Sequence, residues 1–530
     1  MKRFFRPLYL ILFLAFVLSS CGSQKMISTP VENIDNLALK TTPIAENDLI
    51  RWSHLDLVND TIPGMSVDKA YKELIKGKKG KKVIVGIVDS GVDINHEDLK
   101  GVIWTNPKEI AGNGIDDDKN GYIDDIHGWN FLGDAVHEQL EMTRIVKKGP
   151  GTPDYERAKS ELEKERAELT GIKPQYDMIS QANEGIKKHL NKDTYTIEDL
   201  KAIKTDNSEL IRNKTIMTQI GGMIGEGFVE KFQEEYDHVI SSLNYNLNVE
   251  FDGRKIVGDN PDDLNDTKYG NNNVIGPEPN EAKHGTHVAG IVAQVRGNGL
   301  GGDGVTNNAQ IMTLRAVPNG DEYDKDIALA IRYAVDNGAK VINGSFGKYF
   351  SQHKEWVMDA IKYAESKDVL VVIAAGNESY DLDVTNKYPN DTYDGSPEYA
   401  KNVLIIGALS PSYGSKVIAD FSNYGKNNVD IYAPGDEIYA TTPLNSYEYL
   451  QGTSMASPNV AGVATLIRSY YPKLTAVQVK QIIMESGTPL KNQVVIGEDK
   501  HKANFADASK SGRIVNAYNA LLLAAKMSKK

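Results

Sequence analysis

The chain has 530 residues, of which 40% are apolar and 25% are charged. This composition is typical of a globular protein and excludes a collagen-like, fully disordered or coiled-coil chain. The formal net charge is −12, and an acidic chain argues against general nucleic-acid binding, which needs a basic face. The single cysteine, Cys21, excludes an intrachain disulfide and a thiolate metal cluster.

The first twenty residues have the pattern of an export signal. A basic start precedes the apolar run Leu8–Leu18, which is too short to span a bilayer but matches a signal-peptide core. The string Leu18-Ser19-Ser20-Cys21 resembles a bacterial lipobox, which implies cleavage before Cys21 and lipidation of its thiol. We therefore expect residues 1–20 to be a lipoprotein signal peptide. The mature protein would be an exported lipoprotein, held by Cys21 at the periplasmic face or the cell surface. The alternative is a plain secretory signal with an incidental cysteine.

After residues 21–46, a polar stretch that we expect to be a tether, strand and helix patterns alternate. Val83–Val88 is a continuous apolar run, as in a buried parallel strand, and similar runs follow at Ile311–Leu314, Lys340–Ile342, Val369–Ala374 and Val403–Gly407. Helical patterns lie between several of them, for example at Asp326–Asn337 and Lys354–Ser366. The order predicts an α/β fold with a mostly parallel sheet flanked by helices. The chemistry should lie at the carboxyl ends of its strands.

Residues 135–250 interrupt this alternation. They are charged and have helical spacing with little strand character, and two apolar faces can be traced, Ile179, Ala182, Ile186 and Leu190 on one and Phe232, Tyr236, Val239 and Leu243 on the other. We expect an all-helical insertion into a main domain made of residues 47–134 and 251–526. One hypothesis places the insertion over or beside the active cleft as a lid or a partner-docking arm. The alternative is a surface decoration without effect on the site.

Three short segments carry candidate catalytic residues. Asp89 ends a strand in Val88-Asp89-Ser90-Gly91, His284 opens a helix in His284-Gly285-Thr286-His287, and Ser454 opens another in Gly452-Thr453-Ser454-Met455. Each segment alone is weak evidence for a catalytic residue, because an aspartate after a strand is usually a turn former and a serine before a helix is usually an N-cap. Together they provide a nucleophile, a base and a carboxylate that orients the base. The helix N-terminus adds N–H groups for a developing oxyanion.

The order Asp, His, Ser within these strings resembles the subtilisin family of serine peptidases. Two further strings strengthen the resemblance, Ala374-Ala375-Gly376-Asn377 and Val341-Ile342-Asn343-Gly344-Ser345-Phe346-Gly347. It implies a subtilisin-like fold and a serine endopeptidase that cleaves proteins or peptides through an acyl-enzyme, without an organic cofactor. Together with the export signal, it leads us to expect an extracytoplasmic enzyme. By residue, it implies that Asp89 orients, His284 is the base, Ser454 attacks and Asn377 donates to the oxyanion, with substrate binding at Ser345, Phe346, Gly347 and Gly376.

Several alternatives stay open at this point. His287 is a rival base, because spacing alone does not choose between two histidines three residues apart; the resemblance implies that His287 packs the helix. One alternative is a catalytically silent binding protein of the same fold, although such proteins usually lack a triad or oxyanion residue and all four are present here. Another is an exopeptidase, in which the insertion blocks one end of the groove and activity depends on peptide length. Many relatives fold with an inhibitory N-terminal domain, for which the stretch after Cys21 is too short, so we expect maturation without one or restraint by the insertion.

Residues 113–125 are dense in carboxylates. Oxygen-bearing side chains recur at nearly alternate positions, as in the first half of a calcium loop, and the candidate ligands are Asp116, Asp118, Asn120, Tyr122 and Asp124. Gly121 allows the sharp turn, but His127 stands where an EF-hand requires glutamate, so this is not an EF-hand. We expect a structural Ca²⁺ here. The alternative is a solvated acidic turn.

Overall fold

The computed structural model describes residues 29–31 and 44–529. The predicted signal peptide, Cys21 and most of the predicted tether lie outside these residues. Within the described ranges, no helix combines the length and apolar character needed to cross a membrane.

A nine-stranded sheet forms the centre of the molecule, in the order β10-β13-β7-β6-β5-β4-β1-β3-β2. All neighbouring strands are parallel except the pair β10–β13 at one edge. The strands are β1 (Val83–Asp89), β2 (Gly128–Asn130), β3 (Ala309–Arg315), β4 (Val341–Gly344), β5 (Leu370–Ala374), β6 (Val403–Leu409), β7 (Ile431–Pro434), β10 (Thr488–Pro489) and β13 (Arg513–Ile514). The predicted α/β fold with a mostly parallel sheet is confirmed, and the five apolar runs are β1, β3, β4, β5 and β6.

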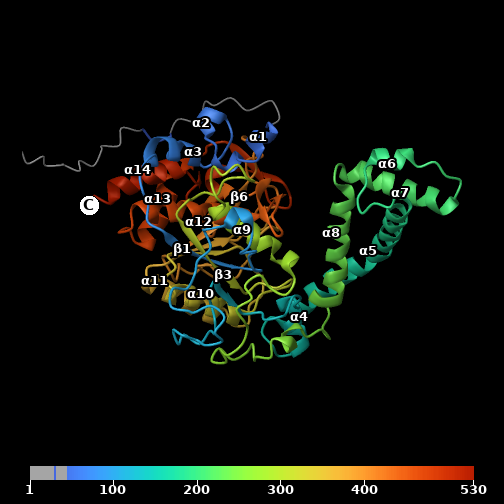
Figure 1. Cartoon of the computed structure of the whole chain (residues 1–530), viewed down its shortest axis with the longest axis horizontal. Coiled ribbons are helices and arrows are strands. Elements are labelled where there is room, and N and C mark those ends of the chain that lie inside the picture. Colours follow the sequence, from blue (N-terminus) through green and yellow to red (C-terminus); the bar gives the residue numbers. More distant parts are fainter. Residues whose placement is uncertain (1–28, 32–43, 530) are drawn as a thin grey trace, which may run out of the picture.

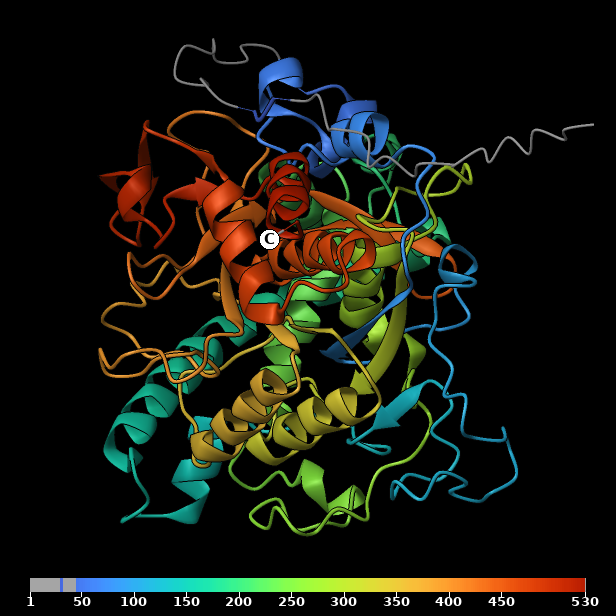
Figure 2. The same cartoon turned by 90° about the vertical axis from the view of Figure 1, so that its left-hand side faces the viewer.

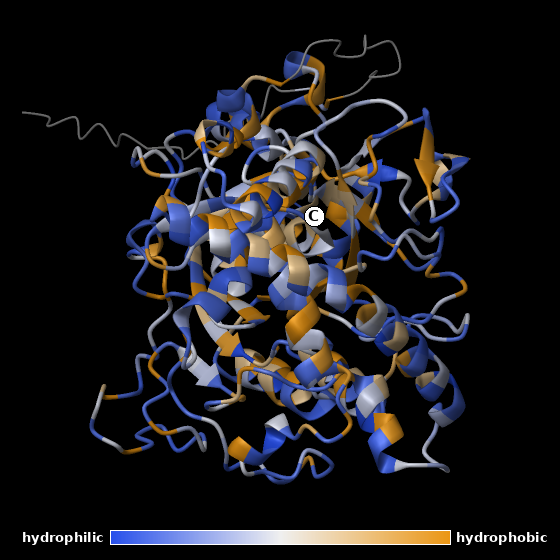
Figure 3. Cartoon of the chain, turned by 90° about the vertical axis from the view of Figure 1, so that its right-hand side faces the viewer, coloured by the Kyte–Doolittle hydropathy of each residue, from blue (hydrophilic) through white to orange (hydrophobic). Residues whose placement is uncertain are grey.

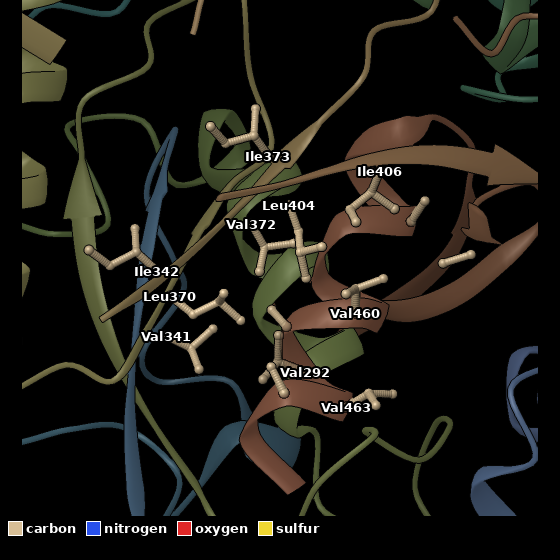
Figure 4. Close-up of a cluster of buried hydrophobic side chains, with 14 of the residues drawn as sticks. Val292, Val341, Ile342, Leu370, Val372, Ile373, Leu404, Ile406, Val460 and Val463 are labelled. Atoms are coloured by element: carbon tan, nitrogen blue, oxygen red, sulfur yellow. The ribbon is translucent and has the colours of Figure 1, made fainter. Parts of the chain in front are cut away.

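Helices cover both faces of this sheet (Figure 1). On one face lie α9 (Lys283–Ala293) and α12 (Thr453–Tyr470), and on the other α10 (Asp324–Asp336) and α11 (Lys354–Ser366). Figure 4 shows side chains of β4, β5 and β6 meeting Val460 and Val463 of α12 and Val292 of α9. Each such buried side chain contributes about 1.5–3 kcal/mol, and because the strands are covered on both faces their sequences are continuous apolar runs.

The N-terminal helices lie together at the top of Figure 2, where α3 (Val67–Ala70) packs against the C-terminal helix α14 (Ala517–Met527). The N-terminal part also contains α1 (Glu46–Leu49) and α2 (Leu57–Asp60), and the C-terminal part adds α13 (Ala476–Ser486). Ser66 joins the two parts, because its Oγ donates to Asp56 Oδ2 at 2.8 Å and accepts from Asn516 Nδ2 at 3.0 Å. Two small hairpins complete the body, β8 (Ile438–Thr442) with β9 (Ser446–Leu450) and β11 (Gln493–Ile496) with β12 (His501–Asn504).

Five helices form an arm that stands beside the body (Figure 1). They are α4 (Glu141–Lys148), α5 (Tyr155–Leu190), α6 (Ile197–Ala202), α7 (Ser208–Ile224) and α8 (Phe228–Ser241). The arm has its own outer cluster of buried side chains, which includes Ile179, Ala182, Ile186, Leu200, Met217, Ile220, Phe228 and Phe232. A separate base cluster joins the arm to the body and consists of Met142, Ile145, Ala158, Leu162, Leu247 and Phe350. Hydrophobic residues gather inside the body and hydrophilic ones dominate the peripheral loops (Figure 3).

Candidate active site

Four neighbouring strands, β5, β4, β1 and β3, end at one edge of the sheet and supply most of the candidate residues. Asp89 is the last residue of β1, Ser345 follows β4, and Asn377 comes shortly after β5. His284 and Ser454 are each the second residue of a helix, in α9 and α12, and these two helices pack against each other. Because parallel strands end together, residues far apart in the chain meet at this edge.

Asp89 and His284 form the central contact. Asp89 Oδ1 lies 2.6 Å from His284 Nδ1 and also accepts the Ser90 backbone N–H at 2.8 Å. An ionised carboxylate only accepts, so Nδ1 carries the proton and Nε2 keeps its lone pair. Asp89 is 2% exposed, whereas the His284 side chain is 39% exposed and lines a cleft. Burial alone would lower the pKa of His284, but the charge and hydrogen bond of Asp89 outweigh it and raise that pKa above its ordinary value.

His287 lies in a different environment from His284. Its ring is fully buried, and Nε2 lies 3.1 Å from the backbone carbonyl oxygen of Glu448 in β9. Burial lowers the pKa of His287 to about 3, so the ring stays neutral at ordinary pH. The contact with Asp89 therefore distinguishes the two histidines, and His287 packs α9 against the β8–β9 hairpin.

Ser454 lies in the first turn of α12, behind Gly452, whose φ of 144° favours glycine. In this structure Ser454 Oγ donates to the backbone carbonyl oxygen of Ser345 at 3.1 Å. The hydroxyl of Ser345 donates in turn to the Ser454 carbonyl oxygen at 2.8 Å and lies 2.8 Å from Ser457 Oγ. The Ser345 side chain is therefore an anchor for the start of α12, while its carbonyl faces the candidate nucleophile.

Asn377 is held by one end of its side chain. Its Oδ1 accepts the backbone N–H of Thr453 at 2.8 Å and the Thr453 hydroxyl at 3.0 Å. Both lone pairs of the amide oxygen are thus engaged, and Nδ2 is turned towards Gly452, where a Cβ atom would lie 3.4 Å from it. Nδ2 therefore lies beside the first turn of α12, whose second residue is Ser454.

A cleft of about 350 Å³ lies beside Asp89 and His284. Two backbone segments bound it, residues 317–322 after β3 and residues 345–347 after β4. The expected substrate-binding residues Ser345, Phe346 and Gly347 thus line the cleft, whereas Gly376 lies next to Asn423, whose Nδ2 would come within 2.4 Å of a Cβ there. Sequence reasoning missed residues 317–322, although their place at the carboxyl end of a strand was a usable signal.

Arg315, at the end of β3, also lines the cleft and was not expected there. Its buried guanidinium donates to neutral acceptors, among them the carbonyl oxygens of Ser90 at 3.1 Å and Ala135 at 2.6 Å and Asn130 Oδ1 at 3.0 Å. Burial lowers the pKa of Arg315 to about 10, still far above neutral pH. The arginine therefore fastens the chain that leads into the arm to the turn after Asp89. Such backbone acceptors leave no mark in the sequence.

The acidic loop is arranged differently from the expected ligand set. Asp116 Oδ2 accepts the Gly121 N–H at 2.8 Å and Asp124 Oδ2 accepts the Gly114 N–H at 2.9 Å, so these carboxylates close the loop itself. The ring of Tyr122 packs edge-on against Trp129 and Tyr333.

Asp118 instead joins two acidic residues that sequence reasoning missed. Glu109, Asp118 and Asp125 each offer an oxygen, and these oxygens lie within 4.8 Å of one another. Asn120 Nδ2 donates to Asp125 Oδ2 at 2.8 Å, and Glu109 Oε2 is buried without a hydrogen-bond partner among the described residues. Burial raises the pKa of Asp125. Glu109 precedes the acidic loop and is not part of its pattern of alternating ligands. Only the fold places its carboxylate beside Asp118 and Asp125.

Comparison with known proteins identifies relatives of this chain. Residues 80–504 match the family model described as the subtilase family. The chain is 43% identical over 187 residues to a thermophilic serine proteinase of Bacillus sp. (strain AK1), covering 35% of this chain and 42% of the relative. It is 32% identical over 274 residues to subtilisin-like protease 1 of Plasmodium vivax, covering 47% and 41%. It is 39% identical over 187 residues to thermitase of Thermoactinomyces vulgaris, covering 35% and 61%. The chain thus spans less than two thirds of the length of each of these relatives.

Proposed function

Because the chain belongs to the subtilase family, we propose that it is a serine endopeptidase that hydrolyses peptide bonds in proteins or peptides. The observation that carries the proposal is the 2.6 Å contact between Asp89 and His284 at the edge of a cleft, where α9, the helix of His284, packs against α12, the helix whose second residue is Ser454. The relative named as a serine proteinase and the relative named as a subtilisin-like protease support the same reaction class.

In the proposed mechanism, the Ser454 hydroxyl turns from the Ser345 carbonyl towards His284 Nε2. His284 takes the hydroxyl proton as Oγ attacks the scissile carbonyl carbon, and Asp89 stabilises the imidazolium through Nδ1. Asn377 Nδ2 and the N–H groups at the start of α12 stabilise the oxyanion. His284 then protonates the leaving amine, and water, activated in the same way, hydrolyses the acyl-enzyme.

Labelling with a fluorescent fluorophosphonate tests this proposal. The reagent reacts with an activated serine hydroxyl and releases fluoride, so wild-type protein should be labelled and the Ser454→Ala variant should not. The Ser457→Ala variant is the matched control, because Ser457 lies in the same turn and its hydroxyl contacts Ser345. Absence of labelling in folded wild-type protein would leave a binding protein of this fold as the better explanation.

We further propose that Glu109, Asp118 and Asp125 hold a structural Ca²⁺. Three carboxylates that approach within 4.8 Å in a partly buried place repel one another, and a hard divalent cation relieves this repulsion. The unpartnered Glu109 Oε2 supplies a free oxygen ligand. When bound, the ion would cross-link the acidic loop to the segment that carries Glu109 and would take no part in the chemistry.

The proposed location is outside the cytoplasm, at a membrane. The support is the sequence of residues 1–21 alone, since they lie outside the described part of the chain. Lipidated protein should partition into a detergent phase, and the Cys21→Ser variant should appear in the aqueous phase. Equal partitioning of the two forms would favour a plain secretory signal.

A further inference from the structure

The arm is joined to one of the two segments that bound the cleft. We name residues 317–322 the β3 wall and residues 345–347 the β4 wall. The β3 wall pairs with the chain entering the arm, whose Val136 also lines the cleft: Asn319 N–H donates to the Val136 carbonyl oxygen, and Glu138 N–H donates to the Asn319 carbonyl oxygen, both at 2.9 Å. The β3 wall is therefore paired with the extended segment that leads into the arm, which we call the arm base together with α4.

Arg144 in α4 holds the same wall. Its guanidinium is buried and donates to two successive carbonyl oxygens, those of Asp321 at 2.8 Å and Glu322 at 3.1 Å. It also donates to the Gln139 carbonyl oxygen at 2.9 Å and stacks over the Tyr323 ring at 4.0 Å. A planar fork of this kind fixes both position and orientation of the groups it binds.

Glu141 connects this arrangement to the β4 wall. Its Oε2 pairs with Arg144 and lies 3.0 Å from the ammonium of Lys348, the residue directly after Gly347. The Lys348 ammonium also donates to the Glu322 carbonyl oxygen at 2.7 Å. Glu141, Arg144 and Lys348 are each at most 5% exposed, so the charges are paired away from water. The arm base thus ties the two walls together.

We propose that Glu141 and Arg144 are positioning residues for the substrate, fixing the separation of the β3 and β4 walls so that an extended peptide can bond to both. This inference rests on the proposed peptidase function. Main-chain hydrogen bonds give an extended peptide its affinity for segments such as these two walls. A misplacement of the bound peptide by about 1 Å costs about 10²-fold in rate. The dependence should grow with the length of peptide held between the walls. The rate at which a small reagent reacts with Ser454 should therefore not change when Glu141 or Arg144 is replaced.

The test compares substrates of increasing length. In the Arg144→Lys and Glu141→Gln variants, kcat/KM for a hexapeptide should fall by about tenfold or more, mainly through KM. Hydrolysis of a single-residue ester and the rate of fluorophosphonate labelling should stay within about twofold of wild type. The matched control is Asp177→Asn, which breaks the 2.7 Å ion pair with Lys173 in the outer part of α5 and should leave every substrate unaffected.

An equal loss for the ester and the hexapeptide would show a general structural defect and overturn the positioning role. An unchanged hexapeptide would overturn it as well. If the charge variants fail to fold, Asn246→Ala decides, because its uncharged amide donates to the carbonyl oxygens of Asn319 at 3.1 Å and Glu138 at 2.9 Å. That variant should show the same length-dependent loss, and its absence would refute the proposal. Wild-type protein that neither labels nor hydrolyses any substrate would instead overturn the proposed function itself.

Discussion

Asp89 and Arg315 are paired in register as the last residues of the neighbouring parallel strands β1 and β3, yet their charges are used separately. The Asp89 carboxylate accepts from His284, whereas the Arg315 guanidinium donates to backbone carbonyl oxygens and to Asn130. Among the described residues, no ion pair joins the two. The Asp89 carboxylate is therefore not neutralised by Arg315 and interacts with the imidazole of His284, while Arg315 holds the turn that follows Asp89 in place.

The first prediction concerns the pH dependence of hydrolysis. His284 accepts a proton only when it is neutral, so kcat/KM should rise as pH increases through its pKa, and the midpoint should lie above the ordinary histidine value because Asp89 raises that pKa. In Asp89→Asn the charge is lost while the burial remains, so the midpoint should move to lower pH. The rate should also fall by about 10⁴-fold. A pH–rate profile of both proteins gives the answer, and an unmoved midpoint would contradict the assignment of His284.

The second prediction concerns the oxyanion. Asn377→Ala should reduce kcat by about 10²–10³-fold with little change in KM, the magnitude known for the oxyanion-hole asparagine of subtilisin, a member of the same family. The expected loss is in kcat because Asn377 Nδ2 would donate its hydrogen bond to the oxyanion that forms in the transition state. Thr453→Ser is the control, since it keeps the hydroxyl and the N–H that hold Asn377 Oδ1. Steady-state kinetics on one peptide decide it, and an Asn377→Ala variant with wild-type kcat would exclude the role.

The third prediction concerns calcium. A ligand that binds only the folded state at about 100 times its Kd adds about 2.7 kcal/mol of stability, so a chelator should lower the Tm of the wild-type protein by several degrees. Asp118→Asn should start from a lower Tm and respond little, because one carboxylate of the cluster is gone. Differential scanning fluorimetry with and without chelator measures this. The same chelator response in Asp118→Asn and wild type would place the ion elsewhere.

The fourth prediction concerns the outer part of the arm. Phe232 is buried in the outer cluster, so Phe232→Ala should cost about 3–5 kcal/mol of local stability. The outer and base clusters are separate, so faster amide hydrogen exchange should be confined to the outer helices, while labelling of Ser454 stays unchanged. Exchange monitored by mass spectrometry distinguishes the outcomes. Faster exchange in β1 or α12 would show that the arm and the body unfold together.

Most of the fold could be predicted because its signals are local. A strand covered on both faces needs an unbroken apolar run, and β1, β5 and β6 each show one in a few consecutive residues. The apolar face of α5 repeats with the helical period and meets Phe232 and Tyr236 of α8 in the outer cluster. Short strands such as β2 and β13 carry no such pattern, since neighbouring strands determine their pairing.

The sequence alone determined which residues are candidates for the chemistry. Local patterns put Asp89 at the end of a strand and His284 and Ser454 at the starts of helices, and the family resemblance gave these residues their roles. Tertiary structure decided what surrounds them. It separated His284 from His287 through one contact with Asp89, brought Glu109 to Asp118, and joined Arg144 to the β3 wall of the cleft. These are contacts between distant residues, several of them to backbone carbonyl oxygens. Every residue has such a carbonyl, so no sequence pattern marks the one that a distant side chain will meet.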